Sequence, residues 1–456
     1  MDTYVTIRLL RSALITAIGV LAVSILANYS LSFGSNLQQI DNSSNKENVT
    51  LSAILEDQGD PARWNSLIGP ALDRLREGHP DITINIDYRT FPYNETREKL
   101  LSTLSEHIPI DLITLDQIWL GEFAEDRLIA DLTNYTQTWD RQKDWYEVNW
   151  DGGAVDKNIY GIWAWTDVRG IWYWKDLLEE ASVDPNSLKT WDGYIAAAKQ
   201  LDSVLRPQGI EGIHLTGAGH SPDLWYPYLW MLGGNILQER EGHPTKGTYW
   251  FPAFNNSEGV RAMKFIKDQV DAGIKPQKNH FWGEEFLDRK FAVMIEALQH
   301  HIPITTADNR SAFEEKVGFI PMFPVPHEDN QTSTLMGGWL FSIPSTSTHK
   351  DLAWELITIM LEPDILGPYL VNHANLPTQI PIGEGPFSEE PMRVIPYYND
   401  LISMIPSGHE RPNIREYPQI AEFVKEALDS VLYKGADPKR SLDDAASASA
   451  KVLGWL

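Results

Sequence analysis

The sequence contains no cysteine. This absence excludes disulfide bonds, thiolate metal ligands and cysteine nucleophiles, and it also excludes a lipid anchor attached to a cysteine side chain. Positive charge is scarce as well, because 38 lysines and arginines stand against 63 aspartates and glutamates, giving a formal net charge of −25. A negative field of this size repels nucleic acids and anionic membrane surfaces, so neither is an expected partner.

Motifs for nucleotides and metals are also missing. No Gly-x4-Gly-Lys-Ser/Thr motif occurs, and the neighbouring His300 and His301 lack the helical spacing of metal ligands. We therefore predict no cofactor and no metal. With 456 residues, 43% of them hydrophobic and 22% charged, the chain is globular and long enough for two lobes.

The N-terminus carries an export signal. Arg8 and Arg11 precede an uncharged apolar run that continues to about Phe33, which orients the segment with its N-terminus inside the cell. We predict a signal anchor or transmembrane helix over residues 1–33 and a flexible linker over 34–48, with the body outside. A removed signal peptide, cleaved near Ala22-Val-Ser24, and a buried soluble helix are the alternatives.

Asn-x-Ser/Thr triplets are numerous, and their number favours an extracytoplasmic, glycosylated exterior. They begin at Asn28, Asn42, Asn48, Asn94, Asn134, Asn255, Asn309 and Asn330.

The first part of the body alternates between strand and helix patterns. We predict strands over 49–55, 82–88 and 111–115, with helices over about 64–75 and 95–105 between them. Such alternation is typical of a largely parallel α/β sheet, in which ligands bind beyond the carboxyl ends of the strands. The residues at these ends are Glu56, Asp57, Asp60, Arg89 to Tyr93 and Asp116 to Trp119.

The chain has 17 tryptophans, and several of them stand beside carboxylates or glycines in predicted loops. An aromatic face packs against the C–H face of a sugar ring while a carboxylate accepts its hydroxyl protons, so this pairing favours a carbohydrate ligand. The expected contacts are Trp119, Trp165, Trp225, Trp282 and Trp339, whereas Trp172, Trp174, Trp230 and Trp354 are expected in the core.

The order of short motifs along residues 49 to 456 resembles the extracellular solute-binding proteins of family 1, in particular the trehalose/maltose-binding branch. The motifs are Trp64-x3-Ile68-Gly-Pro-Ala71, Asp111-Leu-Ile-Thr-Leu-Asp116-Gln-x-Trp119, Tyr160-Gly-Ile, Tyr173-x-Lys175-Asp-Leu-Leu, Thr190-Trp191-Asp192, Leu232-Gly-Gly-Asn235, Met336-Gly-Gly-Trp339 and Arg411-Pro-x3-Glu-Tyr-Pro418. Each motif alone is weak, and their common order and spacing are specific.

The resemblance implies a two-lobed, periplasmic-binding-protein-like (type II) α/β fold with discontinuous lobes joined by a hinge. The chain would cross the hinge near Tyr160, near Val317 and near Pro377. One lobe would then comprise residues 49–160 and 318–376, and the other residues 161–317 and 377–456.

The resemblance also implies where a ligand binds. Asp60, Arg97 and Asp116 would line one lobe, and further contacts would come from Trp165 and Asp167, from Gly338 and Trp339, and from Arg411. Each residue also has a purely structural interpretation: Asp116 as a helix cap, Arg97 on a solvated helix face, Arg411 as part of a turn.

One motif departs from the family. Sugar-binding relatives often carry Asn-Trp-Pro after an Ala-x-Met strand, whereas this chain has Glu296-Ala297 after Ala292-Val-Met294. Glu296 would bring a carboxylate to the site, so a different sugar, a polyol or a cationic solute are alternatives to a common disaccharide.

These features predict capture of a carbohydrate for an ABC importer, with a transmembrane permease and a cytoplasmic ATPase as partners and a monomeric binding protein. No catalytic residue is predicted. The alternatives are an exported glycoside hydrolase, for which Asp60, Asp116, Asp167 and Glu296 would supply the two carboxylates, and a surface adhesin.

Overall fold

The structure is a computed structural model that describes residues 46–57, 60–216, 222–277, 283–302 and 306–456. The predicted membrane segment, residues 1–33, and nearly all of the predicted linker lie outside these ranges, as does Trp282. Along the described ranges, no helix has the length and apolar character needed to cross a bilayer.

The larger sheet has seven strands in the order β16-β6-β15-β3-β1-β2, with β17 beside β15. Its strands are β1 (Glu47–Glu56), β2 (Ile82–Phe91), β3 (Leu112–Asp116), β6 (Ile162–Val168), β15 (Thr334–Ser342), β16 (Leu376–Pro377) and β17 (Gly408–His409). β1 runs parallel to β2 and β3, which confirms the strands predicted over 49–55, 82–88 and 111–115. β15 runs antiparallel to both β3 and β6 and thereby brings late sequence between early strands.

A four-stranded sheet has the order β14-β7-β13-β8, and three two-stranded ribbons complete the β-structure. The four strands are β7 (Gly170–Trp174), β8 (Glu211–Ile213), β13 (Phe291–Glu296) and β14 (Val317–Ile320). The ribbons pair β4 (Ala154–Val155) with β5 (Asn158–Ile159), β9 (Leu215–Thr216) with β12 (Pro276–Gln277), and β10 (Leu237–His243) with β11 (Gly247–Pro252). The chain passes from the larger sheet to the smaller one between β6 and β7, at Arg169.

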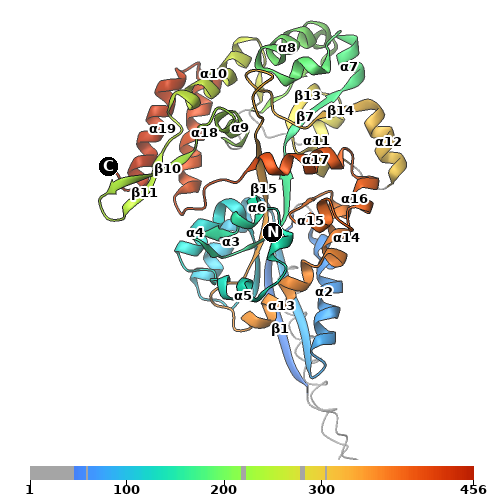
Figure 1. The fold of residues 1–456 in the computed structure, drawn as a ribbon, viewed down its shortest axis with the longest axis vertical. Coiled ribbons are helices and arrows are strands. Elements are labelled where there is room, and N and C mark those ends of the chain that lie inside the picture. The colour runs from blue at the N-terminus through green and yellow to red at the C-terminus, as the bar shows by residue number, and fades with distance from the viewer. Residues whose placement is uncertain (1–45, 58–59, 217–221, 278–282, 303–305) are drawn as a thin grey trace, which may run out of the picture. The chain divides into compact units, whose positions relative to one another are not determined.

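Helices of the larger sheet form where apolar residues recur at helical spacing. In α2 (Asn65–Gly78), Leu67, Ile68, Ala71, Leu72 and Leu75 are buried, as the sequence pattern predicts. This helix lies beside α13, as Figure 1 shows. The other helices near this sheet are α3 (Tyr93–Ser105), α4 (Leu120–Glu125), α5 (Thr133–Thr138), α6 (Glu147–Asp151), α13 (Lys350–Met360), α14 (Pro363–His373) and α15 (Ile380–Gly383).

The last two helices, α18 (Tyr417–Lys434) and α19 (Pro438–Val452), pack against each other and against α10 (Ser257–Asp271). In Figure 1 they stand next to the β10–β11 hairpin. The stripe of Ile420, Val424 and Leu428 is buried along α18, and Gly435 ends this helix with a φ of 65°. The remaining α-helices are α7 (Lys175–Glu180), α8 (Trp191–Leu205), α9 (Tyr226–Trp230), α11 (Gly283–Leu287), α12 (Ala307–Lys316), α16 (Glu389–Val394) and α17 (Tyr398–Met404).

Candidate functional site

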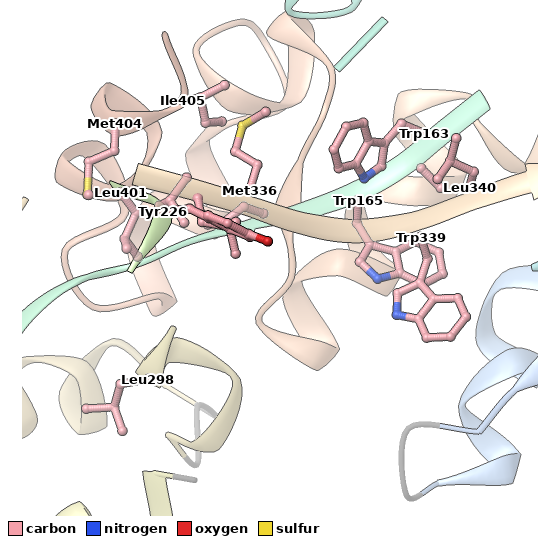
Figure 2. Packing of buried hydrophobic residues seen from close by; sticks show 14 of the residues in the cluster. Trp163, Trp165, Tyr226, Leu298, Met336, Trp339, Leu340, Leu401, Met404 and Ile405 are labelled. Atoms are coloured by element: carbon pink, nitrogen blue, oxygen red, sulfur yellow. The ribbon is translucent and has the colours of Figure 1, made fainter. Parts of the chain in front are cut away.

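A single row of residues crosses the larger sheet at the end of β3. Asp116 pairs with Trp339 across β3 and β15, and Trp339 pairs with Trp165 across β15 and β6. Figure 2 shows Trp165 and Trp339 side by side on these two strands. The motifs Asp116-x2-Trp119, Met336-Gly-Gly-Trp339 and Trp165-x-Asp167 therefore meet at one place, although they lie far apart in the sequence.

Three aromatic rings, which we call the aromatic trio, surround Asp116. The Tyr93 ring lies 5.5 Å from the Trp119 ring and 6.1 Å from the Trp339 ring, and the two indoles are 5.7 Å apart, nearly perpendicular at 86°. Tyr93 also donates a hydrogen bond of 2.9 Å from its hydroxyl to Asp116. Trp119 and Trp339 are 4% and 8% exposed, whereas Tyr93 is 46% exposed. The aromatic surface that a solute reaches is thus mainly that of Tyr93.

Trp165 belongs to a separate buried cluster. It is 2% exposed and packs against Trp64, Phe341 and Tyr369, with ring centroids 5.5 to 5.9 Å away. The guanidinium of Arg63 lies 5.9 Å from the Trp165 ring and donates to the Tyr369 hydroxyl at 2.7 Å. In this conformation Trp165 forms the floor beneath the site rather than part of its surface.

Arg411 bridges two carboxylates from different parts of the chain. Its Nη1 lies 3.0 Å from Asp223, in the 3-10 helix η6 (Pro222–Leu224), and its Nη2 lies 3.5 Å from Asp116. The side chain of Gln117 holds the Arg411 main chain on both sides, accepting from its N–H at 3.3 Å and donating to its carbonyl at 2.8 Å. Because Gln117 is fully buried, the position of Arg411 is well defined.

Arg169 makes a second bridge of the same kind. Its Nε lies 2.8 Å from Glu296, at the end of β13, and its Nη1 lies 3.4 Å from Asp167, at the end of β6. Asp167 also accepts a hydrogen bond from the Gly337 main chain at 3.2 Å. Each arginine therefore joins a carboxylate of the larger sheet to a carboxylate that lies elsewhere.

The two bridges form one electrostatic cluster with more acids than bases. Desolvation lowers the pKa of Arg169 and Arg411, but the neighbouring carboxylates raise it by more. Both guanidinium groups therefore stay charged. Burial raises the pKa of Asp116, and Arg411 and Tyr93 oppose that shift. Four carboxylates against two guanidinium groups leave a surplus of acceptors, which suits a ligand that donates hydrogen bonds.

His300 lies close to this cluster, in the 3-10 helix η7 (Leu298–His301) that follows β13. Desolvation by the surrounding protein lowers its pKa to about 4. The charge of Asp167 opposes this shift, whereas Arg63 and Arg169 add to it. His300 is therefore neutral at pH 7 and offers one donor and one acceptor.

Glycine is required at position 338 because neighbouring atoms leave no space for a side chain. Its φ is 144°, and a Cβ atom there would lie 2.2 Å from Trp163 Nε1 and from the Trp165 carbonyl oxygen. β15 pairs with β6 antiparallel on both sides of this glycine, and the register between the two strands shifts after Trp339. The Gly-Gly pair thus positions the Trp339 ring.

Some predicted residues lie apart from the cluster or have structural partners. Arg97 forms a bidentate pair with Glu122, with N–O distances of 2.6 to 3.0 Å. Asp60 is exposed and caps the 3-10 helix η1 (Pro61–Trp64) through the Ala62 N–H. Asp116 is both a cap, 3.4 Å from the Ile118 N–H, and a member of the cluster. Trp172 and Trp174 are buried as expected, whereas Trp230 and Trp354 are partly buried.

Several site residues were not singled out by sequence reasoning. Tyr93 falls in the segment after the second strand, so strand ends signalled its region but not its role. Asp223 stands two residues before Trp225, an expected ligand contact that is fully buried. Gln117 falls in the segment after the third strand, so its region was signalled but its role was not. Arg169 had no sequence signal, because it acts through partners distant in the chain. Among the described residues, no group of three or more His, Asp or Glu side chains is arranged to hold a metal ion.

Comparison with known proteins identifies the class. Residues 59–365 match the family model of the bacterial extracellular solute-binding proteins, and the chain belongs to this family. A putative binding protein of Brucella abortus is 22% identical over 415 residues, which are 86% of this chain and 92% of the relative.

Two solved structures are similar in fold. A solute-binding protein of an ABC transporter from Thermotoga lettingae, bound with α-D-tagatose, has a TM-score of 0.71 at 21% identity, covering 90% of this chain and all of that one. The sugar-binding protein MalE of Xanthomonas citri has a TM-score of 0.72 at 19% identity, covering 89% and 97%. The fold is therefore the α/β fold of periplasmic binding proteins, as predicted.

Proposed function

We propose that this protein is the extracytoplasmic solute-binding component of an ABC importer and that it captures a carbohydrate, a di- or oligosaccharide, at the aromatic trio. The observation that carries this proposal is Tyr93, whose exposed ring stands beside the Trp119 and Trp339 rings while its hydroxyl bonds to Asp116. A sugar ring packs on an aromatic face and donates its hydroxyl protons to nearby carboxylates.

The related structures support a sugar. One carries α-D-tagatose, and another is named as a sugar-binding protein. We extend the ligand class to this chain because the described site combines aromatic rings with a surplus of carboxylate acceptors. The proposed contacts are Asp60, Arg97, Asp116, Trp119, Trp165, Asp167, Trp282, Glu296, Gly338, Trp339 and Arg411, to which we add Tyr93, Asp223 and His300.

We propose that the ligand lies in a cleft between two lobes and that binding favours the closed arrangement. The lobes would comprise residues 49–160 with 318–376, and 161–317 with 377–456. The Arg411 bridge supports this view, because it joins Asp116 of the first lobe to Asp223 of the second. Since β6 belongs to the larger sheet and β14 to the smaller one, the first two crossings would lie at about Arg169 and just after Ile320. The closed form would be delivered to a permease driven by a separate ATPase, with no catalysis by this chain.

The test is a thermal-shift panel of the full-length protein with monosaccharides, oligosaccharides and polyols. A ligand that binds only the native state raises the melting temperature by mass action, roughly 2.7 kcal/mol of added stability at 100 times its Kd. We expect at least one oligosaccharide to raise it and calorimetry to give one site. A complete panel without any shift would contradict the carbohydrate proposal.

A cationic solute is the second candidate, and the surplus of carboxylates in the cluster favours it. Quaternary amines in the same panel test this candidate directly. A glycoside hydrolase would instead release reducing ends from the oligosaccharides. All four carboxylates of the cluster are held in ion pairs with arginine, which does not match the separate acid and nucleophile or base that glycoside hydrolysis requires.

We propose that the N-terminal segment, residues 1–33, tethers a monomeric body to the outer face of the membrane. Support comes from Arg8 and Arg11 before the apolar run and from the triplets of possible N-glycosylation. Cell fractionation and N-terminal sequencing of the mature protein test the tether. A sequence that begins near Ser24 or Asn28 would show a removed signal peptide.

A further inference from the structure

A second hollow, which we call the hairpin pocket, lies beside the β10–β11 hairpin. Its volume is about 730 Å³, within the range of small-molecule pockets. One wall comes from α4, α6 and β4, the other from α9 and the hairpin, and residues 409–414 lie between them. Arg411 is the only residue that it shares with the candidate site.

The hairpin pocket is acidic. The basic residues that line it are Lys246, His409 and Arg411. Burial lowers the pKa of His409, and Arg411 is already bound to Asp116 and Asp223. The acidic lining residues are Glu125, Asp151, Asp156, Glu239 and Glu410.

The carboxylates of the pocket form two groups: the first contains Glu125 and Asp156, and the second contains Glu410 and Asp151. Desolvation raises the pKa of Glu125, and the charges of Glu416 and Asp156 add to that shift, whereas a hydrogen bond from the Arg415 main chain and the charge of Lys246 oppose it. Desolvation likewise raises the pKa of Glu410, with a contribution from Asp151. No described residue forms an ion pair with Asp151 or Glu410, so the second group lacks a compensating positive charge within the described chain.

Aromatic side chains complete the walls. Tyr249 and Trp250 come from β11, and Trp230, at the end of α9, stacks on His409 at 4.8 Å and 18°. The ammonium group of Lys246 lies 3.5 Å from the centre of the Tyr249 ring. The pocket thus already holds one alkylammonium group against an aromatic face, a contact that also suits a ligand cation.

From these contacts we infer that the hairpin pocket is a second binding site and that it takes a linear organic polyamine. One ammonium group would bind at Asp151 and Glu410, and another would bind near Glu125 and Asp156, where it would take the place of the Lys246 ammonium group on the Tyr249 ring. A compact monocation can satisfy only one of the two groups, which is why we expect a linear ligand with separated charges.

The position of the pocket implies coupling to the solute site. Residues 409–414 line the pocket, and the Arg411 side chain in this segment reaches Asp116 beside the aromatic trio. A polyamine that fixes this segment would change the affinity of the solute site, and linkage requires the reverse effect to be equal. The coupling rests on the proposed solute site, whereas polyamine binding itself does not.

The experiment is calorimetric titration of the full-length protein with spermidine, a linear triamine, with NaCl and MgCl2 at matched ionic strength as blanks. Two pocket variants remove negative charge without changing shape, Asp151→Asn with Glu410→Gln, and Glu125→Gln with Asp156→Asn. Asparagine tolerates the left-handed backbone of residue 156, whose φ is 48°. The matched control, Glu77→Gln with Glu98→Gln, removes two exposed charges from α2 and α3.

We expect spermidine to bind the wild type and the control alike and to bind each pocket variant at least tenfold more weakly, with unchanged melting temperatures for the free variants. Equal binding by all four proteins would show attraction to the overall negative charge and overturn the site. So would a wild-type Kd above about 1 mM. Spermidine binding without any saccharide binding would keep the pocket and reject the carbohydrate proposal, and the converse result would do the opposite.

Discussion

Trp339 on β15 lies directly opposite Asp116 on β3, and Tyr93 connects the two. The Tyr93 hydroxyl donates to the Asp116 carboxylate at 2.9 Å, and the Tyr93 ring meets the Trp339 ring edge-on at 90°. An acceptor and a set of aromatic faces are thereby fixed relative to each other before any ligand arrives. Such preorganisation reduces the conformational entropy that a ligand must otherwise remove.

Two substitutions of Tyr93 separate the contribution of its aromatic ring to ligand affinity from that of its hydrogen bond. We expect Tyr93→Phe to weaken binding of the saccharide found in the panel by about three- to tenfold, because one hydrogen bond within the site is lost. Tyr93→Ala should weaken binding by roughly 20-fold or more, because the exposed ring is lost too. Calorimetry measures both. Tyr135→Phe, which removes a hydroxyl bonded to Asp351, is the matched control and should leave affinity unchanged.

The two tryptophans of the row should respond differently to replacement. Trp339→Ala should abolish most of the ligand-induced change in tryptophan fluorescence and leave the far-UV circular dichroism unaltered, since this ring belongs to the aromatic trio. Trp165→Ala should also lower the free energy of unfolding by about 3–5 kcal/mol, because a large buried side chain is removed. Wild-type affinity in both variants would remove the proposed aromatic site.

Arg411 should be needed for stability as well as for binding. Arg411→Met removes the guanidinium group that Asp116 and Asp223 share, which should lower the free energy of unfolding by roughly 3–5 kcal/mol. Adding Asp223→Asn to this variant should restore part of the loss, because one of the two negative charges that Arg411 balanced disappears. Urea unfolding at pH 7 measures the four proteins of this cycle, and strictly additive effects would contradict a direct interaction.

The sequence predicted the first three strands and their order because their apolar residues follow strand periodicity and helices intervene. It also predicted that residues after these strands come together at one edge of the sheet, and Tyr93, Asp116 and Trp119 lie there together. This grouping could be predicted for a physical reason. Parallel strands end at one edge of a sheet, so local patterns determine which residues lie near their carboxyl ends.

The partners of these residues could not be predicted in the same way. β15 enters between β3 and β6 from late in the sequence, and no local pattern fixes that register. Arg169 meets Glu296, and Arg411 meets Asp223, through contacts between residues far apart in the sequence. Trp165 was predicted to contact the ligand, and in this structure its ring is buried beneath Arg63 and Tyr369. The sequence did not predict this burial, because tryptophan occurs both in cores and at surfaces.

Gly338 should tolerate no side chain. In Gly338→Ala the new Cβ would meet Trp163 Nε1 and the Trp165 carbonyl, and the backbone would also have to keep a φ of 144°. We expect a loss of about 2–4 kcal/mol in the free energy of unfolding, from steric overlap together with backbone strain. Thermal denaturation measures it. Gly367→Ala, at a helical position where a Cβ meets no atom within 4 Å, is the matched control and should be neutral or stabilising.

His214 should make stability depend on pH in the acid range. It lies in a cavity of about 30 Å³ lined by Trp225, Gln269 and Tyr228, and burial lowers its pKa to about 4 from an ordinary value of 6.5. The unfolded chain therefore binds a proton at a pH where the folded chain does not. The contribution of neutral His214 to stability is complete above pH 6.5 and is lost as the pH falls towards 4, by up to about 3 kcal/mol.

His214→Gln removes this titration and keeps a polar side chain of similar size. We expect the variant to lose less stability than the wild type between pH 6.5 and 4.5, measured by urea unfolding at each pH. His327→Gln, at an exposed histidine, is the matched control and should follow the wild type. Carboxylates also titrate in this range, but they do so equally in all three proteins, so the difference between variant and control isolates the buried imidazole. Parallel curves for the three proteins would mean that His214 is protonated in the folded state without cost, and that the cavity holds water enough to solvate its charge.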